Sequence, residues 1–135
     1  MKFPEYDSPN RNVNFGDLVG KTLTEVRGKV GDGSIHFTTV DGDEYYMWHE
    51  QDCCESVLVE DICGEWDEII GEPILKAEEN SNTDWPADKE KPEYRESYTW
   101  TYYRISTMKG QVVIRWWGSS NGYYSESVSF CKFDK

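Results

Sequence analysis

The sequence predicts an α+β, β-dominated fold: a single antiparallel, twisted sheet in the form of a meander, with one or two short helices. Three observations lead to this prediction. Apolar and polar residues alternate along several short runs, as they do in half-buried strands. Aromatic residues, which favour strands, make up 15% of the chain. Glycine-containing turns separate the runs, and no long amphipathic helix interrupts them.

The chain has the length of one domain. Its 135 residues leave little room for a second core, so we expect a single domain over residues 1–135. Residues 1–13 are polar and contain proline, which predicts a flexible arm. Residues 79–94 combine polar residues and proline, which predicts a long polar loop with Trp85 as its only large apolar residue.

The first half of the chain predicts a helical turn and a hairpin. Residues 14–20 end at a glycine, which is typical of a short helical turn, and residues 22–30 alternate as a strand does. Residues 34–40 and 44–49 are two further alternating runs. The Asp41-Gly42 pair between them is the strongest hairpin signal in the sequence.

The second half predicts a meander. Residues 55–62 and 73–78 are strand candidates, and glycines bound a short helix over residues 64–71, which has acidic residues in its first turn. Further along the chain, short glycine turns join three β-rich runs, which indicates consecutive antiparallel strands. These runs are residues 97–106, 111–117 and 123–130.

Acidic residues are concentrated in one part of the chain. The net charge is −12, but residues 41–93 hold 18 acids and three lysines, a local charge of −15, while the remainder carries +3. Such a chain repels nucleic acids and anionic membranes, so neither is expected as a direct partner. The concentrated charge indicates either a solvated surface or a surface that attracts a basic partner.

One chemical cluster follows the predicted hairpin. His49, Cys53 and Cys54 stand among three carboxylates, and with Cys63 they are weak candidates for zinc ligands. The spacing matches no known zinc pattern, so we expect neither a metal nor another cofactor. A catalytic cysteine is disfavoured because the carboxylates raise a thiol pKa. The alternative, which we favour, is that the cysteines pack as small apolar residues and remain reduced.

A second cluster surrounds the turn after residue 117. Arg115, Asn121 and Tyr123 are candidates for a ligand pocket. Arg115 would bind an anionic group, Asn121 would form hydrogen bonds, and an aromatic ring would stack on the ligand. Cross-strand aromatic pairs that merely stabilise a sheet are the alternative. Carbohydrate binding also stays open, since an aromatic-rich β protein is a suitable scaffold for it.

Several segments, including residues 49–57, resemble a family of small uncharacterised domain proteins of phages, prophages and their bacterial hosts. The matching segments are His49-Glu50-Gln51-Asp52-Cys53-Cys54-Glu55-Ser56-Val57, Val59-Glu60-Asp61-Ile62, Gly71-Glu72-Pro73-Ile74-Leu75, Glu96-Ser97-Tyr98-Thr99-Trp100-Thr101 and Gly118-Ser119-Ser120-Asn121-Gly122-Tyr123-Tyr124-Ser125-Glu126. The resemblance covers most of residues 20–130 and implies an origin in mobile genetic elements. It implies no activity and no catalytic residues.

The expected function is therefore non-catalytic. We expect an anti-defence inhibitor, similar to an anti-CRISPR protein, that binds a host nucleic-acid-handling protein through an acidic surface mimicking nucleic acid. The partner-binding candidates are Glu60, Asp61, Glu65, Asp67 and Glu68. The alternatives are a sponge for a nucleotide immune signal at Arg115, Asn121 and Tyr123, and a small metal- or cysteine-dependent enzyme. No secretion signal or apolar span occurs, which favours the cytoplasm of a bacterial host, and a homo-oligomer stays open.

Overall fold

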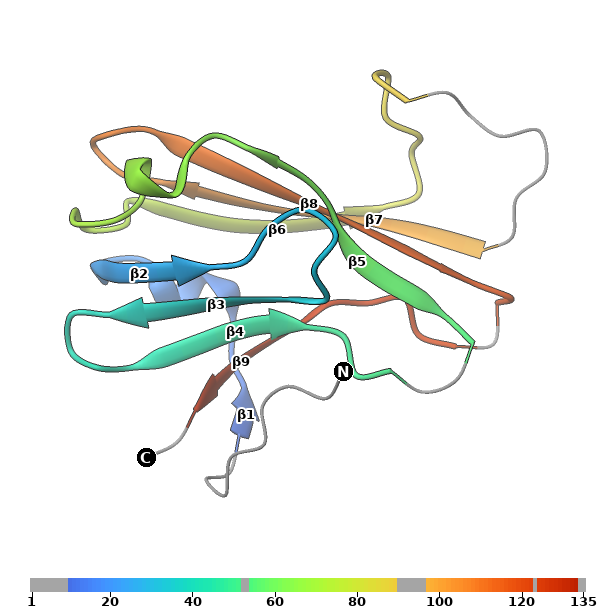
Figure 1. Ribbon diagram of the computed structural model, residues 1–135, viewed down its shortest axis with the longest axis horizontal. Helices are drawn as coiled ribbons and strands as arrows, with labels where there is room; N and C mark the ends of the chain where they lie inside the picture. The colour runs from blue at the N-terminus through green and yellow to red at the C-terminus, as the bar shows by residue number, and fades with distance from the viewer. Residues whose placement is uncertain (1–9, 52–53, 90–96, 123, 134–135) are drawn as a thin grey trace.

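Two antiparallel β-sheets pack face to face in the computed structural model, which describes residues 10–51, 54–89, 97–122 and 124–133 (Figure 1). One sheet has the strand order β1-β9-β4-β3-β2 and the other β5-β8-β7-β6. The β-dominated character is confirmed. The single sheet is wrong, because the described residues form two sheets, and the one or two short helices expected are two short 3₁₀ turns.

The first sheet is built around the predicted hairpin. Its strands are β1 (Asn10–Asn12), β2 (Leu23–Arg27), β3 (Ser34–Thr39), β4 (Glu44–Trp48) and β9 (Ser129–Phe133). Strands β3 and β4 pair from Ser34↔Trp48 to Thr38↔Glu44, which confirms the hairpin. Gly42 has a φ of 87° in the turn, a conformation that strongly favours glycine. Strand β1 falls within the predicted arm and pairs with β9.

The second sheet contains the two longest strands of the acidic segment over residues 41–93, together with two strands that follow that segment. Its members are β5 (Ser56–Cys63), β6 (Lys76–Asn82), β7 (Ser97–Ser106) and β8 (Gln111–Ser120). Strand β6 begins and ends later than the predicted strand over residues 73–78, so the first residues of the predicted polar loop are strand instead. Strands β7 and β8 pair along their whole length, from Ser97↔Ser120 to Ser106↔Gln111, as predicted.

The predicted third strand of the meander is wrong in its partner and position. Residues 124–128 are not strand, and β9 joins the first sheet between β1 and β4. Strand β8 also continues through Gly118, which was expected in a turn. A Cβ atom at Gly118 would lie 2.6 Å from the carbonyl oxygen of Glu126, so this glycine permits the returning chain to cross close to the strand.

Two 3₁₀ turns replace the expected helices. The turn η1 (Phe15–Leu18) lies within the predicted helical turn and confirms it, and η2 (Trp66–Glu68) is much shorter than the helix predicted over residues 64–71. Neither is long enough to present a helical face. No helix in the described part of the chain has the length and apolar character that crossing a membrane requires.

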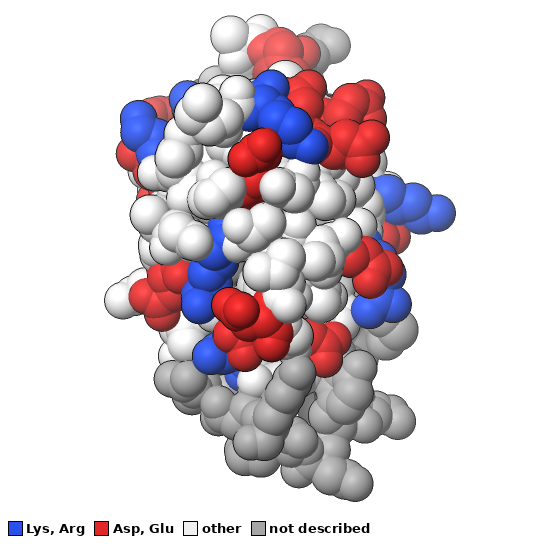
Figure 2. Space-filling model, turned by 90° about the vertical axis from the view of Figure 1, so that its left-hand side faces the viewer, with Lys and Arg blue, Asp and Glu red and all other residues white. Residues whose placement is uncertain are grey.

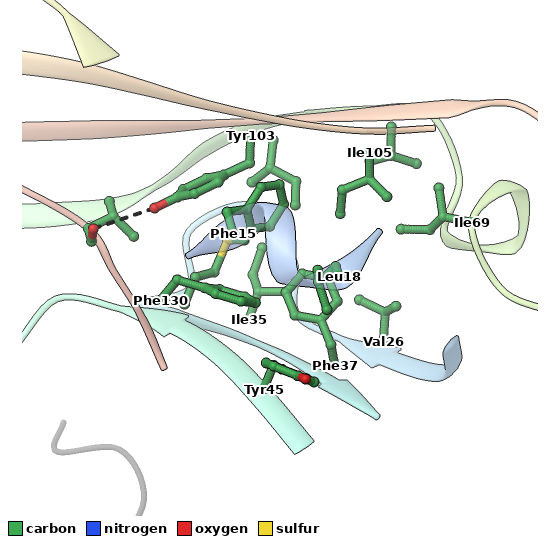
Figure 3. Packing of buried hydrophobic residues seen from close by; sticks show 14 of the residues in the cluster. Phe15, Leu18, Val26, Ile35, Phe37, Tyr45, Ile69, Tyr103, Ile105 and Phe130 are labelled. Atoms are coloured by element: carbon green, nitrogen blue, oxygen red, sulfur yellow. Dashed lines mark hydrogen bonds between the residues drawn. The ribbon is translucent and has the colours of Figure 1, made fainter. Parts of the chain in front are cut away.

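The core lies between the inner faces of the two sheets (Figure 3). Phe15 of η1 inserts there, with its ring centre 4.7 Å from that of Tyr103 and 5.0 Å from that of Phe130. The Tyr103 hydroxyl donates to the carbonyl of Val128 at 3.4 Å, drawn as a dashed line in Figure 3. Burial raises the pKa of Tyr103 well above its usual range, so the phenol stays protonated.

Candidate functional site

The outer face of the second sheet carries an aromatic and charged surface. Alternation along β7 and β8 sends one set of side chains into the core and the other set outward. The outward set comprises Tyr98, Trp100, Tyr102 and Arg104 on β7, and Arg115 and Trp117 on β8. The sequence predicts this one-sided set on β7, because those four residues alternate with the others.

Residues 83–89, here called the strap, cross this outer face. Figure 1 shows the segment, in yellow, on the side of the sheet away from the other sheet. Trp85 packs edge-to-face on Tyr98, Trp100 and Trp117, with ring centres 5.2, 5.5 and 5.4 Å away. Its indole N–H donates to the Lys89 carbonyl at 3.1 Å. The strap is therefore anchored to β7 and β8 by one tryptophan.

Ion pairs attach the far end of the strap. Both terminal nitrogens of Arg115 donate to the Asp88 carboxylate at 3.0 Å, and its Nε donates to Glu60 at 2.7 Å. Lys89 reaches the other oxygen of Glu60 at 2.5 Å. A bidentate arginine–carboxylate pair fixes geometry as well as distance. The strap thus spans the sheet from β6 to β5.

The titration behaviour of this network follows from its contacts. The hydrogen bond with Asp88 raises the pKa of Arg115, and the same bond lowers the pKa of Asp88. Burial alone would raise the pKa of Glu60, but hydrogen bonds from Lys89 and Arg115 outweigh it and lower that pKa. Arg115, Asp88 and Glu60 are therefore ionised at neutral pH.

The guanidinium group of Arg115 is bonded to other residues of the protein. All of its nitrogens donate to Glu60 or Asp88, and its guanidinium lies 5.2 Å from the centre of the Trp100 ring. Asn121 is exposed in the turn after β8, and Tyr123 lies outside the described residues. The nucleotide pocket predicted at these three residues therefore lacks a free arginine.

A hollow of about 600 Å³ adjoins the strap on the side of β6 and β7. Its lining combines two aromatic rings, carboxylates, amides and one arginine. The lining residues are Glu78, Glu79, Asn80, Asn82, Asp84, Trp85, Pro86, Tyr102 and Arg104. Sequence reasoning missed this site, although the lone tryptophan in a polar segment is a signal that could have indicated it.

The five predicted partner-binding acids fall into two groups. Asp61, Glu65 and Asp67 are exposed, and their side chains have no hydrogen-bond or ion-pair partner among the described residues. Glu60 pairs with Arg115 and Lys89, and Glu68 accepts from the backbone N–H of Gln111 at 3.2 Å. On the face that Figure 2 shows, acidic side chains form several groups with basic and neutral residues between them.

His49 and Glu55 form a buried pair between the two sheets. The Nε2 atom of His49 lies 2.6 Å from Glu55, whose side chain is fully buried, and its Nδ1 atom lies 2.8 Å from the Ser127 carbonyl. Gln51 adds a hydrogen bond to the Glu55 backbone carbonyl at 2.6 Å. His49 thus joins the chain that leaves β4 to the chain that enters β5, through Glu55, and to the chain that enters β9, through Ser127. Both imidazole nitrogens are therefore occupied by protein groups.

The cysteines differ from the expectation of four reduced thiols. Cys54 is disulfide-bonded, whereas Cys63 and Cys131 are free thiols. Cys53 lies outside the described residues. In the part of the chain that the structure describes, no three His, Cys, Asp or Glu side chains are grouped as metal ligands. His49, Cys54 and Cys63 are not brought together as a metal site.

His36 is a buried titratable group on the outer side of the first sheet. Its Nδ1 atom accepts from Arg27 at 2.9 Å, and its Nε2 atom lies 3.2 Å from Glu44. Burial lowers the pKa of His36, and the charge of Arg27 lowers it further, while Glu44 and Glu25 act in the opposite direction. The accepted hydrogen bond requires a neutral imidazole.

We expect the free energy of unfolding to decrease as the pH is lowered, because His36 takes up a proton. In the unfolded chain the imidazole has its ordinary pKa of 6.5, so it takes up a proton more readily than in the folded state. The stability due to neutral His36 is complete above this value and is lost as the pH falls toward the folded pKa. Urea unfolding at a series of pH values should give a steeper decline for the wild type than for His36→Gln. Parallel curves would contradict this expectation.

Comparison with known proteins gives a family and no function. A family model described as "Domain of unknown function (DUF7448)" matches residues 16–130. No curated protein and no solved structure gives a significant match. Since the model covers most of the chain and both sheets, the chain belongs to the DUF7448 family.

Proposed function

We propose that this protein is a non-catalytic binding protein whose partner carries a basic, nucleic-acid-binding surface. The observation that carries the proposal is the set of exposed carboxylates without ion-pair partners at Asp61, Glu65 and Asp67. Unpaired surface carboxylates in a chain of net charge −12 attract a basic partner at long range and speed its association. No direct binding to nucleic acid is expected, because the charges repel.

The proposal assigns different roles to the five acids. Asp61, Glu65 and Asp67 are free to meet basic side chains of the partner. Glu60 forms ion pairs with Arg115 and Lys89, and Glu68 accepts a hydrogen bond from the backbone of Gln111 after the β7–β8 turn. These two acids therefore stabilise the fold beneath the surface and do not contact the partner. Charges that are already paired add little to attraction between proteins.

The biological setting in this proposal comes from the resemblance to phage and prophage proteins. In the cytoplasm of a bacterial host, an acidic binder would act against defence by occupying the nucleic-acid channel of an immune protein, in the manner of an anti-CRISPR inhibitor. The nucleotide-sponge alternative has less support, because Arg115 is committed to Glu60 and Asp88.

The test measures inhibition of DNA binding by purified CRISPR effector complexes over a salt series. We expect the protein to displace labelled DNA from at least one complex, with an affinity that falls steeply as salt rises. The triple variant Asp61→Asn, Glu65→Gln, Asp67→Asn should weaken displacement by about tenfold or more, corresponding to about 1.4 kcal/mol or more.

A charge-matched variant is the control. Asp17, Asp41 and Glu50 are also exposed and lack partners among the described residues, so Asp17→Asn, Asp41→Asn, Glu50→Gln removes the same charge from other positions. Equal weakening by the two triple variants would indicate a net-charge effect and not a surface. Binding that is insensitive to salt and to both variants would refute the proposal.

A further inference from the structure

We propose that the hollow between the strap and strands β6 and β7 binds a neutral saccharide of one or two sugar units. The hollow measures about 600 Å³, within the range of small-molecule sites in proteins. This site is separate from Asp61, Glu65 and Asp67, none of which lines it. The proposal therefore stands independently of the acidic surface.

The polar lining offers both donors and acceptors that are free. Glu78 and Asp84 supply carboxylate oxygens, Arg104 supplies guanidinium donors, and Asn80 supplies both kinds of group. None of these four side chains has a hydrogen-bond or ion-pair partner among the described residues. Each sugar hydroxyl donates one hydrogen bond and accepts others, so a polyhydroxylated ligand can satisfy both sets.

The charge of the lining selects against ionic ligands. Glu78 and Asp84 would repel an anion such as a phosphorylated nucleotide, whereas the Glu79 carboxylate accepts from the Tyr103 hydroxyl on the opposite face. Arg104 offsets one of the two carboxylates, so a simple cation gains little from the lining, while a neutral molecule with many hydroxyl groups uses its acceptors and its donors alike. The lining thus favours an uncharged sugar over the nucleotide expected at the Arg115 cluster.

Register places the polar groups and one ring on the same face of the sheet. Glu78 lies opposite Arg104 and Asn80 lies opposite Tyr102, in alternate pairs of the β6–β7 ladder, so all four side chains share one face. Side chains in such pairs stand close together on one face. Sugars present apolar C–H faces as well as hydroxyls, and the Tyr102 ring supplies an apolar surface beside the polar groups.

The opposite wall is held in place before any ligand binds. Trp85 is fixed by three edge-to-face contacts and by its hydrogen bond to the Lys89 carbonyl. The backbone N–H of Asp84 donates to the Asn82 side chain at 3.0 Å, which orients the first turn of the strap. A wall that is already ordered costs little conformational entropy on binding.

The test uses defined sugars as probes. Glucose, galactose, mannose, N-acetylglucosamine and their common disaccharides are titrated at millimolar concentrations, with binding followed by protein NMR shifts and tryptophan fluorescence. We expect saturable binding of at least one neutral sugar, with shifts at Tyr102 and Trp85. Asp84→Asn should weaken it by about tenfold, the usual effect of losing a charged hydrogen-bond acceptor.

Asp67→Asn is the matched control, because it removes the same charge from an exposed residue that does not line the hollow. It should leave sugar affinity unchanged. Tyr102→Phe, which retains the ring, should bind more tightly than Tyr102→Ala, and a thermal melt of each variant verifies folding. The proposal is overturned if no neutral sugar binds, if glucuronic acid or a free amino acid binds more tightly, or if Asp67→Asn weakens binding as much as Asp84→Asn.

Discussion

Trp116→Ala is expected to lower the free energy of unfolding by about 3–5 kcal/mol, the usual cost of deleting a large buried ring. Trp116 is fully buried on the inner face of β8 and belongs to the main core cluster. Its indole N–H points to the Met47 sulfur at 3.2 Å, so the side chain connects the second sheet to β4 of the first. Urea unfolding followed by far-UV circular dichroism measures the effect.

The control for this substitution is Met108→Ala. Met108 is 78% exposed in the turn after β7, and surface substitutions usually change stability by less than about 0.5 kcal/mol. A Trp116→Ala variant with the urea midpoint of the wild type would show that the two sheets do not depend on this contact. The sandwich packing described for the core would then be incorrect.

His49→Ala should also be destabilising, by about 1–3 kcal/mol, because it removes a 2.6 Å contact from a buried carboxylate that keeps only its other bonds, among them the one from the Gln51 side chain. The Glu55 side chain is fully buried, and His49 lies 2.6 Å from it. The double variant His49→Ala, Glu55→Ala removes both groups, so its loss should be smaller than the sum of the two single losses. Unfolding of all four proteins in urea completes the cycle.

An exposed ion pair provides the comparison. Lys89 is 41% exposed where it meets Glu60, and Lys89→Ala should therefore cost no more than about 1 kcal/mol. If His49→Ala were as mild as Lys89→Ala, the His49–Glu55 pair would not be anchoring the two crossovers between the sheets. Additive losses in the cycle would lead to the same conclusion.

Local sequence signals predicted the strands well and their assembly poorly. Asp41-Gly42 determines a tight turn, so the pairing of β3 with β4 is predictable from the residues that are close to it in the sequence. The sequence predicts a strand over residues 123–130 beside β8, but the strand that forms there, β9, begins at Ser129 and pairs with β1 and β4 instead. The distinction depends on the crossing at Gly118 and on the buried Glu126, which accepts from Thr99 at 2.8 Å and from Ser120 at 2.6 Å. Such contacts join residues that no local pattern connects.

The candidate site, too, was predictable in its local elements but not in their assembly. The one-sided aromatic set on β7 and the isolated Trp85 were visible in the sequence, but nothing local says that the strap folds back over that face. Arg115 and Asp88 are 27 residues apart, so their bidentate pair is a product of the tertiary fold. For that reason Arg115 looked available to a ligand when considered with its sequence neighbours alone.

The place of β9 between β1 and β4 has a consequence during synthesis. Strands β2, β3 and β4 are sequential and can form a meander early, but the outer edge of β4 stays unpaired until residues 129–133 have left the ribosome. Unpaired strand edges are templates for association with other chains. Nascent or truncated chains that lack β9 should therefore be the species on which chaperones act and from which aggregates grow.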